Sequence, residues 1–144
     1  MKIIFIFLIF IFSNIASAEN INFKKIVDLK DPWGSTFVDQ NNMLITEKGG
    51  IIKLVNINNK DLDLINHNLN FLEHGQGGLL DILFNDNFVY ISYSENRGNW
   101  KTSTSIARAK FDNKNLIFEN IFQANPAIDS GYHFGSRLAI KDNF

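Results

Sequence analysis

Short apolar runs separated by clusters of turn residues fill the chain from residue 19 onward. No window keeps the i, i+3, i+4, i+7 spacing of an amphipathic helix over several turns. The stretch at 41–60 instead predicts strands at 43–46 and 51–55, joined by a Lys-Gly-Gly turn at 48–50. This hairpin pattern predicts an all-β protein.

Downstream segments have the same character. A polar turn at 85–87 precedes Val89, Ile91 and Tyr93, which alternate with other residues and so fall on one face of a strand. Another strand is predicted within 102–112, where apolar residues stand among polar ones. The stretch at 113–123 indicates a turn followed by a strand.

A weak internal repeat relates three parts of the chain. Each puts an apolar strand before an Asp/Asn turn, with 47 residues from Phe37 to Phe84 and 56 from Phe84 to Ile140. Periods of about 40 to 50 residues with several strands per unit are typical of propeller blades. A β-sandwich also has strands at turn-punctuated intervals, so the pattern alone favours neither fold. Residues 19–144 hold roughly three units, whereas propellers close with about 4 to 8 blades, so we expect the front portion of a longer protein.

The first 18 residues have the layout of a secretory signal peptide. One Lys precedes an unbroken apolar run at 3–12, and small residues end the segment at Ala16-Ser17-Ala18. An uncleaved anchor is the alternative, but the apolar run is well short of the roughly 20 residues that a spanning helix needs. The sequence therefore predicts cleavage before Glu19, a periplasmic or secreted mature protein and no stable membrane insertion.

Charge content argues against nucleic-acid binding, and cysteine content excludes stabilisation by disulfides. Lys and Arg total 14 and Asp and Glu total 15, so the chain has no basic field of the kind that attracts nucleic acid. Cysteine is absent, so an exported protein of this sequence depends on packing or bound ions for its stability.

Six segments, taken in order, resemble the glucose/sorbosone dehydrogenase family, the exported aldose dehydrogenases that use pyrroloquinoline quinone. They are DPWGSTFVD (31–39), MLITEKGG (43–50), GQGGLLDILF (75–84), VYISYSE (89–95), TSIARAKF (104–111) and SGYHFGSRL (130–138). The resemblance implies a six-bladed β-propeller, of which this chain would supply roughly the first two to three blades. It also implies pyrroloquinoline quinone and a calcium ion at one end of the central channel.

The resemblance assigns two site residues. His133 matches the family's general base, which takes the hydroxyl proton from the anomeric carbon of an aldose while hydride passes to the quinone. An imidazole, whose unperturbed pKa is about 6.5, suits a base near neutral pH. Gln76 matches the substrate-contacting glutamine, and its amide can both donate to and accept from sugar hydroxyls. The structural alternatives are a packed neutral histidine and a solvated turn residue.

Other aromatic and imidazole side chains are interpreted as structural. We expect His67 and His74 to be solvated loop residues, and Trp33 and Trp100 to pack in the core or at its rim. Tyr132 precedes the candidate base where some relatives carry an acid, which bears on the local tuning of His133.

Charged candidates are also interpreted as structural. Glu47 and Asp81 are expected to hold a turn or a strand end, and Arg137 to form an ion pair with a carboxylate. No metal or cofactor ligand is assigned in this chain, because the family's quinone and calcium ligands are expected beyond residue 144.

Two hypotheses from different classes follow. In the first, the chain is the N-terminal part of an exported quinone-dependent aldose dehydrogenase that passes electrons to an acceptor the sequence does not identify. In the second, it is a non-catalytic exported propeller or sandwich that binds carbohydrate or a protein partner. A reading frame that continues past Phe144 into further blades with paired basic residues would favour the enzyme.

Overall fold

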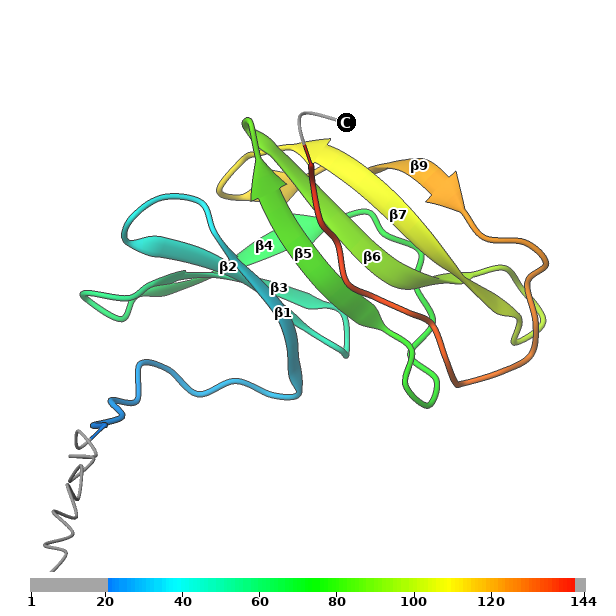
Figure 1. Cartoon of the computed structure of the whole chain (residues 1–144), viewed down its shortest axis with the longest axis horizontal. Helices are drawn as coiled ribbons and strands as arrows, with labels where there is room; N and C mark the ends of the chain where they lie inside the picture. Colours follow the sequence, from blue (N-terminus) through cyan, green and yellow to red (C-terminus); the bar gives the residue numbers. More distant parts are fainter. Residues whose placement is uncertain (1–20, 142–144) are drawn as a thin grey trace, which may run out of the picture.

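The computed structural model describes residues 21–141, so the expected signal peptide at 1–18 lies outside the described residues. The described part folds into two sheets, with strand orders β1-β2-β3-β4-β8 and β5-β6-β7-β9 (Figure 1). Their bounds are β1 Pro32–Phe37, β2 Asn42–Glu47, β3 Ile51–Asn56, β4 Leu62–His67, β5 Leu79–Asn85, β6 Phe88–Asn96, β7 Thr102–Lys110, β8 Asn115–Leu116 and β9 Glu119–Gln123. Residues 21–141 include no helix, which confirms the all-β prediction.

The hairpin predicted at 43–55 is present as β2 and β3. Met43 pairs with Val55 and Glu47 with Ile51, and Gly50 closes the turn with a φ of 94°, a conformation that glycine adopts at little cost. The strand predicted after 85–87 is β6, and the strand predicted within 102–112 is β7. The local pattern thus predicted these elements to within a few residues.

Each sheet is built mainly from four consecutive antiparallel strands. β1 to β4 pair in chain order, and β5, β6, β7 and β9 do the same. A sandwich of the immunoglobulin type would instead exchange strands between its sheets through Greek-key connections. Consecutive four-stranded meanders are the blades of a propeller, so the fold resolves the alternative that the sequence pattern left open.

Buried hydroxyl groups join neighbouring blades in a repeated way. The Thr46 hydroxyl accepts from the Gly34 amide at 2.9 Å and donates to the Leu80 carbonyl of the next blade at 2.5 Å. In the second blade, the Ser92 hydroxyl accepts from the Asp81 amide at 3.1 Å and donates to the Ser136 carbonyl at 2.6 Å. Gly34 and Asp81 are 47 residues apart, the spacing of the predicted repeat, which the structure confirms.

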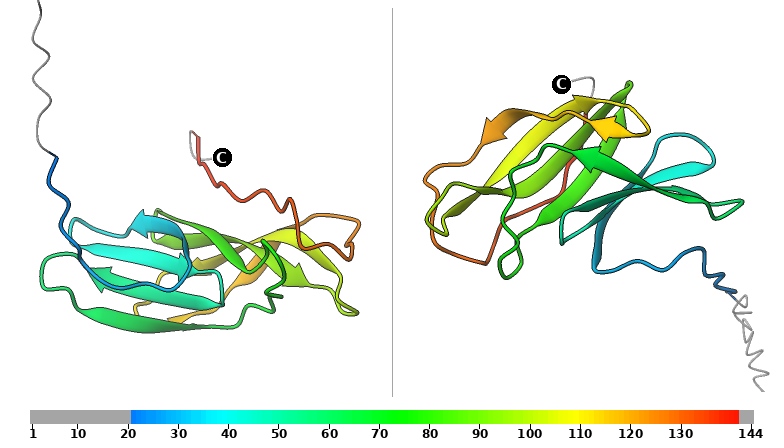
Figure 2. Two further views of the ribbon diagram at one scale, coloured as in Figure 1. Left: turned by 90° about the horizontal axis from the view of Figure 1, so that it is seen from below. Right: turned by 180° about the vertical axis from the view of Figure 1, so that it is seen from behind.

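The segment after β9 completes this pattern. It passes around one end of the second sheet and returns across its face beside β5, as the two further views in Figure 2 show. Ser136 thereby takes the place, relative to the second blade, that Leu80 of β5 takes relative to the first. Residues 136–141 therefore lie where the first strand of a third blade is expected.

Aliphatic and aromatic side chains fill the space between the two sheets. The buried cluster comprises Leu44, Ile52 and Ile65 of the first sheet, Leu79, Ile82, Val89, Ile91, Tyr93, Ala107 and Ala109 of the second, and Leu116 and Phe118 of the β7–β9 connection. That connection also contacts the first blade, because β8 pairs in parallel with β4. The Asn68 side chain bonds both the amide and the carbonyl of Phe118, at 2.7 and 3.1 Å.

The expectation that His67 is a solvated loop residue is wrong. His67 ends β4 and is half-buried. The Leu69 amide donates to its Nδ1 at 3.2 Å, so Nδ1 is unprotonated and Nε2 carries the hydrogen that it shares with the Gly50 carbonyl at 2.9 Å. The imidazole links the end of β4 to the β2–β3 turn.

Candidate active site

Loops at one end of the two blades bring the predicted site residues together. The β4–β5 connection carries Gln76, and the segment after β9 carries His133 (Figure 1). The backbone amide of Gln76 donates to the Gly131 carbonyl at 2.7 Å. The backbone amide of His133 donates to the side-chain Oε1 of Gln76 at 3.1 Å. One hydrogen bond thus joins Gln76 to His133, 57 positions later in the sequence, and a second joins Gln76 to Gly131 of the same segment.

Glycines permit this close approach of two loops. Gly75 has a φ of 57°, and a Cβ atom there would overlap the Gly131 carbonyl group. A Cβ atom on Gly131 would come within 2.9 Å of the His74 ring. Side chains at either position would separate the loops and break the hydrogen bond between Gln76 and Gly131.

His133 has an unusual backbone and an exposed side chain. Its φ is 64°, in the left-handed region that costs a non-glycine residue about 1 to 2 kcal/mol, and the bond to Gln76 helps to hold it. Within residues 21–141 its imidazole has no hydrogen-bond partner, and the ring centroid of Tyr132 lies 6.3 Å away. The imidazole is therefore accessible to a small molecule. Strained backbone of this kind occurs frequently at functional sites.

Hydroxyl side chains of the second blade fix the segment that carries His133. Thr102 donates to the Ser130 carbonyl at 3.2 Å, and Thr104 donates to the Phe134 carbonyl. The sequence reasoning missed these residues. The signal was available, because hydroxyl residues occupy the first four positions of β7, so neither face of the strand is apolar there.

Asp81 and Arg137 form the ion pair that was expected for the arginine. Arg137 Nη1 lies 3.4 Å from Asp81 Oδ1, and the Leu138 amide donates to Asp81 Oδ2 at 2.7 Å. The Asp81 side chain is buried and the guanidinium is exposed. Asp81 therefore fastens the returning segment to β5, in agreement with its predicted structural role.

Glu47 holds the end of β2. Its Oε1 accepts from Lys53 Nζ and from the Lys30 amide, each at 2.6 Å. Burial disfavours the charged carboxylate, but these hydrogen bonds and the positive charge of Lys53 outweigh it and lower the pKa of Glu47. The expectation that Glu47 holds a strand end is confirmed.

Of the two places expected for the tryptophans, the core and its rim, the core is wrong for both. Trp33 on β1 is 43% exposed, and Trp100 in the β6–β7 turn is 67% exposed, so neither belongs to the core. His74 is exposed, as expected for a loop histidine, but its ring lies edge-on to Trp100 with centroids 6.4 Å apart. Trp100 thus lies beside the loop that carries Gln76.

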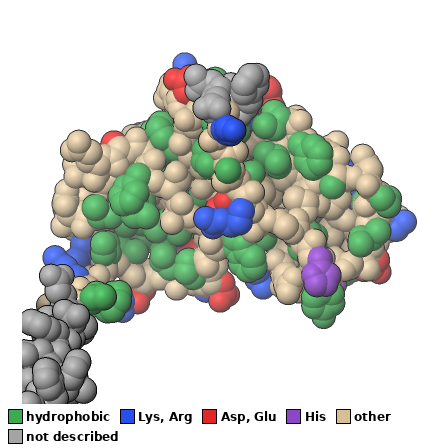
Figure 3. Space-filling model, viewed as in Figure 1, with side chains coloured by type: hydrophobic (Ala, Val, Ile, Leu, Met, Phe, Trp, Pro, Cys, Tyr) green, Lys and Arg blue, Asp and Glu red, His purple; other side chains and the backbone are tan. Residues whose placement is uncertain are grey.

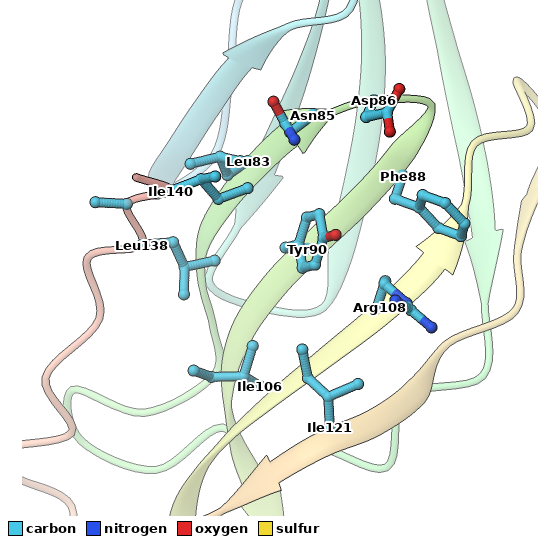
Figure 4. Close-up of a pocket in the computed structure, with 11 residues that line it drawn as sticks. Leu83, Asn85, Asp86, Phe88, Tyr90, Ile106, Arg108, Ile121, Leu138 and Ile140 are labelled. Atoms are coloured by element: carbon cyan, nitrogen blue, oxygen red, sulfur yellow. The ribbon is translucent and has the colours of Figure 1, made fainter. Parts of the chain in front are cut away.

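One hollow of the described residues lies away from this site. A depression of about 540 Å³ lies on the outer face of the second blade, lined by side chains of β5, β6, β7, β9 and the returning segment (Figure 4). Hydrophobic side chains are visible over this side of the molecule in Figure 3. The face is the one that would meet a following blade, so we assign it to blade packing. A smaller hollow of about 160 Å³ adjoins His133 and is lined partly by Thr102 and Thr104.

The described residues offer few groups that could hold a metal ion or a quinone. Residues 21–141 contain no group of three or more His, Asp or Glu side chains that could hold a metal ion. Near the site, Lys48 donates to the Gly75 carbonyl at 3.0 Å, and Arg137 is paired with Asp81. Each of these contacts engages one nitrogen of the cation with a protein group, and no quinone ligand is assigned to either residue. In the same range no helix is long and apolar enough to cross a membrane.

The geometry defines two blades and the start of a third from a β-propeller, with a candidate site in the loops at one end. The chain belongs to the glucose/sorbosone dehydrogenase family, whose sequence profile matches residues 29–144. It is 29% identical over 133 residues to the aldose sugar dehydrogenase YliI of Escherichia coli (strain K12), covering 85% of this chain and 36% of that protein.

Solved structures agree with this assignment. The apo-form of the soluble aldose sugar dehydrogenase from Escherichia coli matches with a TM-score of 0.71 and 29% identity, over 78% of this chain and 35% of the other. The PQQ-bound form of the aldose sugar dehydrogenase from Streptomyces coelicolor, 19% identical, matches with a TM-score of 0.60 over 69% and 32% of the two chains, which shows a shared fold. The chain spans about a third of the length of these relatives.

Proposed function

We propose that the chain is the N-terminal portion of an exported aldose sugar dehydrogenase that oxidises the anomeric carbon of a sugar with pyrroloquinoline quinone as hydride acceptor. The observation that carries the proposal is the contact between Gln76 and the segment of His133 at the loop end of the blades, where the His133 amide donates to Gln76 Oε1 and the Gln76 backbone amide donates to the Gly131 carbonyl. Family membership and the aldose dehydrogenases among the relatives support the reaction class.

In this proposal each residue has one role on the sugar. His133 accepts the proton of the anomeric hydroxyl group as the C1–H bond breaks, and the sugar leaves as a lactone. Gln76 donates its amide hydrogens to sugar hydroxyls while its Oε1 remains bonded to the His133 amide. A bound quinone would supply the acceptor for the hydride released from C1. Residues beyond this chain would hold the quinone and the calcium ion, complete the six blades and pass the electrons on.

The proposal is tested with the full-length protein. Aldose-dependent reduction of a redox dye, measured with added quinone and calcium, is expected to require both additions. A protein that folds, binds the quinone and reduces no dye with any of a panel of aldoses would contradict the enzymatic proposal. The DNA sequence after codon 144 provides an independent check, because an immediate stop codon would contradict the proposal that this chain is a portion.

The expected export has its own test. A signal peptide at 1–18 predicts that protein recovered from the periplasm begins at Glu19. N-terminal sequencing of that material is the measurement. A mature chain that starts at Met1 and stays in the membrane fraction would overturn both the cleavage site and the periplasmic location.

Gln76→Ala is expected to affect turnover as well as sugar affinity. The substitution removes a sugar contact and also the acceptor for the His133 amide, which helps to hold a left-handed backbone. Each lost hydrogen bond costs about 1 kcal/mol, so we expect roughly a fivefold to tenfold change in both kcat and KM. Steady-state kinetics with glucose measure the two effects. Gln40→Ala, which changes an exposed glutamine in the β1–β2 turn, is the matched control, and equal kinetics for the two variants would contradict the role of Gln76.

A further inference from the structure

The β6–β7 turn displays an indole in a conformation that the chain does not favour. Gly98, Asn99 and Trp100 have successive φ values of 78°, 50° and 61°, all in the left-handed region. For a bulky residue such as tryptophan this backbone is a genuine outlier. Three hydrogen bonds fix the turn: Arg97 to Lys101, Lys101 to Gly98, and the Gly98 amide to the Asn96 side chain. The strain is therefore built into an ordered turn.

Burial does not explain the strain. Trp100 is 67% exposed, so its indole contributes little to the core. Beside it lies a hollow of about 440 Å³, lined by Leu72, Asn96, Gly98, Asn99 and Trp100. Leu72 belongs to the β4–β5 connection, and the other lining residues belong to β6 and its turn. The hollow thus lies between the β4–β5 connection and the β6–β7 turn.

The hollow adjoins the candidate active site. The His74 ring meets Trp100 edge-on, with centroids 6.4 Å apart, and it also lies next to Gly131, where an added Cβ atom would come within 2.9 Å of the ring. The Gly131 carbonyl accepts a hydrogen bond from the backbone amide of Gln76, and Gly131 lies two residues before His133. One imidazole ring therefore separates the exposed indole from the residues proposed to bind the reacting sugar.

The chemistry of this surface matches a sugar ring. The C–H face of a pyranose is apolar and packs on an indole, whose face carries partial negative charge, while the hydroxyls at the ring edge stay hydrated or bond to amides. Asn96 and Asn99 are the polar residues among those that line the hollow. A hollow with an aromatic wall and a few polar groups is the usual form of a small-molecule site.

We propose that Trp100 and the hollow beside it form a second sugar subsite, which binds a further ring of an oligosaccharide whose terminal ring is oxidised at Gln76 and His133. The inference rests on the proposed function for the position of the reacting ring, and on the strained, exposed indole for the subsite itself. It identifies the substrate class as aldoses that carry at least one additional sugar unit.

The subsite is tested by binding in the full-length protein labelled with 5-fluorotryptophan. The fluorine resonance of Trp100 is assigned as the one that disappears in Trp100→Phe. It is expected to shift in a saturable way with maltotriose or cellotriose, and to stay unchanged with glucose at the same concentration. The resonance of Trp33, which is exposed on β1, serves as the internal control and is expected to stay unchanged. No response of the Trp100 resonance to either trisaccharide would overturn the subsite.

Kinetics give the second readout. Trp100→Ala is expected to raise the ratio of KM for the trisaccharide to KM for glucose about tenfold, while Trp100→Phe, which keeps an aromatic face, changes it less. Trp33→Phe is the matched control with unchanged kinetics. Glucose oxidation with an unchanged ratio in Trp100→Ala would overturn the subsite and leave the proposed function intact. A saturable Trp100 shift in a protein that oxidises no sugar would support the subsite and overturn the proposed function.

Discussion

Replacing His133 with Gln in the full-length protein is expected to lower turnover by about 10²- to 10⁴-fold, the usual contribution of a general base, which equals roughly 3 to 5 kcal/mol of activation free energy. Glutamine keeps the polarity and approximate volume of histidine but cannot take up a proton at neutral pH. The imidazole is exposed and has no side-chain partner in residues 21–141, so its removal leaves no buried group unsatisfied there. The loss is therefore expected in kcat more than in KM.

His67→Gln is the chemically matched comparison for this test. Both nitrogens of His67 are hydrogen-bonded to the backbone, so the same substitution there is expected to lower the thermal unfolding midpoint and to leave the turnover of folded protein unchanged. Dye reduction with glucose, together with circular dichroism and quinone binding, separates the two outcomes. If His133→Gln binds quinone and keeps near-native turnover, His133 is a structural residue and the proposed mechanism is wrong.

The sequence predicted local structure correctly where neighbouring residues gave a clear hydrophobic and turn pattern. The hairpin at 43–55 combines alternating apolar residues with a glycine turn, and both features depend only on neighbouring positions. β4 was not predicted, and its alternating residues Leu62 and Leu64 are exposed while the adjacent Ile65 is the one that is buried, so the alternation does not mark the core face. Pairing to β3 and to β8 makes this segment a strand.

The candidate site was predictable only in part. Gln76 and His133 were assigned through family resemblance, and their hydrogen-bonded contact spans 57 residues, a distance over which spacing carries no information. Trp100 was expected in the core or at its rim because tryptophan is normally buried, whereas the preceding Gly98 and Asn99 favour a left-handed turn and the indole is 67% exposed. That turn is a local signal, but the contact between Gln76 and His133 depends on tertiary geometry that no local pattern encodes.

The docking of one blade on the next depends on the absence of a side chain at Gly34. A Cβ atom there would lie within 2.8 Å of three backbone atoms of β5: Asp81 Cα, the Ile82 nitrogen and the Leu80 oxygen. Backbone atoms cannot rotate away, so β1 and β5 would have to separate. Separation would also break the contacts through which the Thr46 hydroxyl joins Gly34 to Leu80.

Gly34→Ala is therefore expected to lower the free energy of unfolding by about 3 kcal/mol or more, because overpacking and loss of a buried hydrogen bond each cost roughly 1 to 3 kcal/mol. Urea unfolding of the full-length protein, or its thermal midpoint where unfolding is irreversible, measures the effect. Gly49→Ala is the matched control, since a Cβ atom there meets only Glu73 Oε2, at 3.5 Å, and the expected change is about 0.5 kcal/mol or less. Because the two substitutions add the same methyl group, equal stability of the variants would mean that the first two blades do not pack through Gly34.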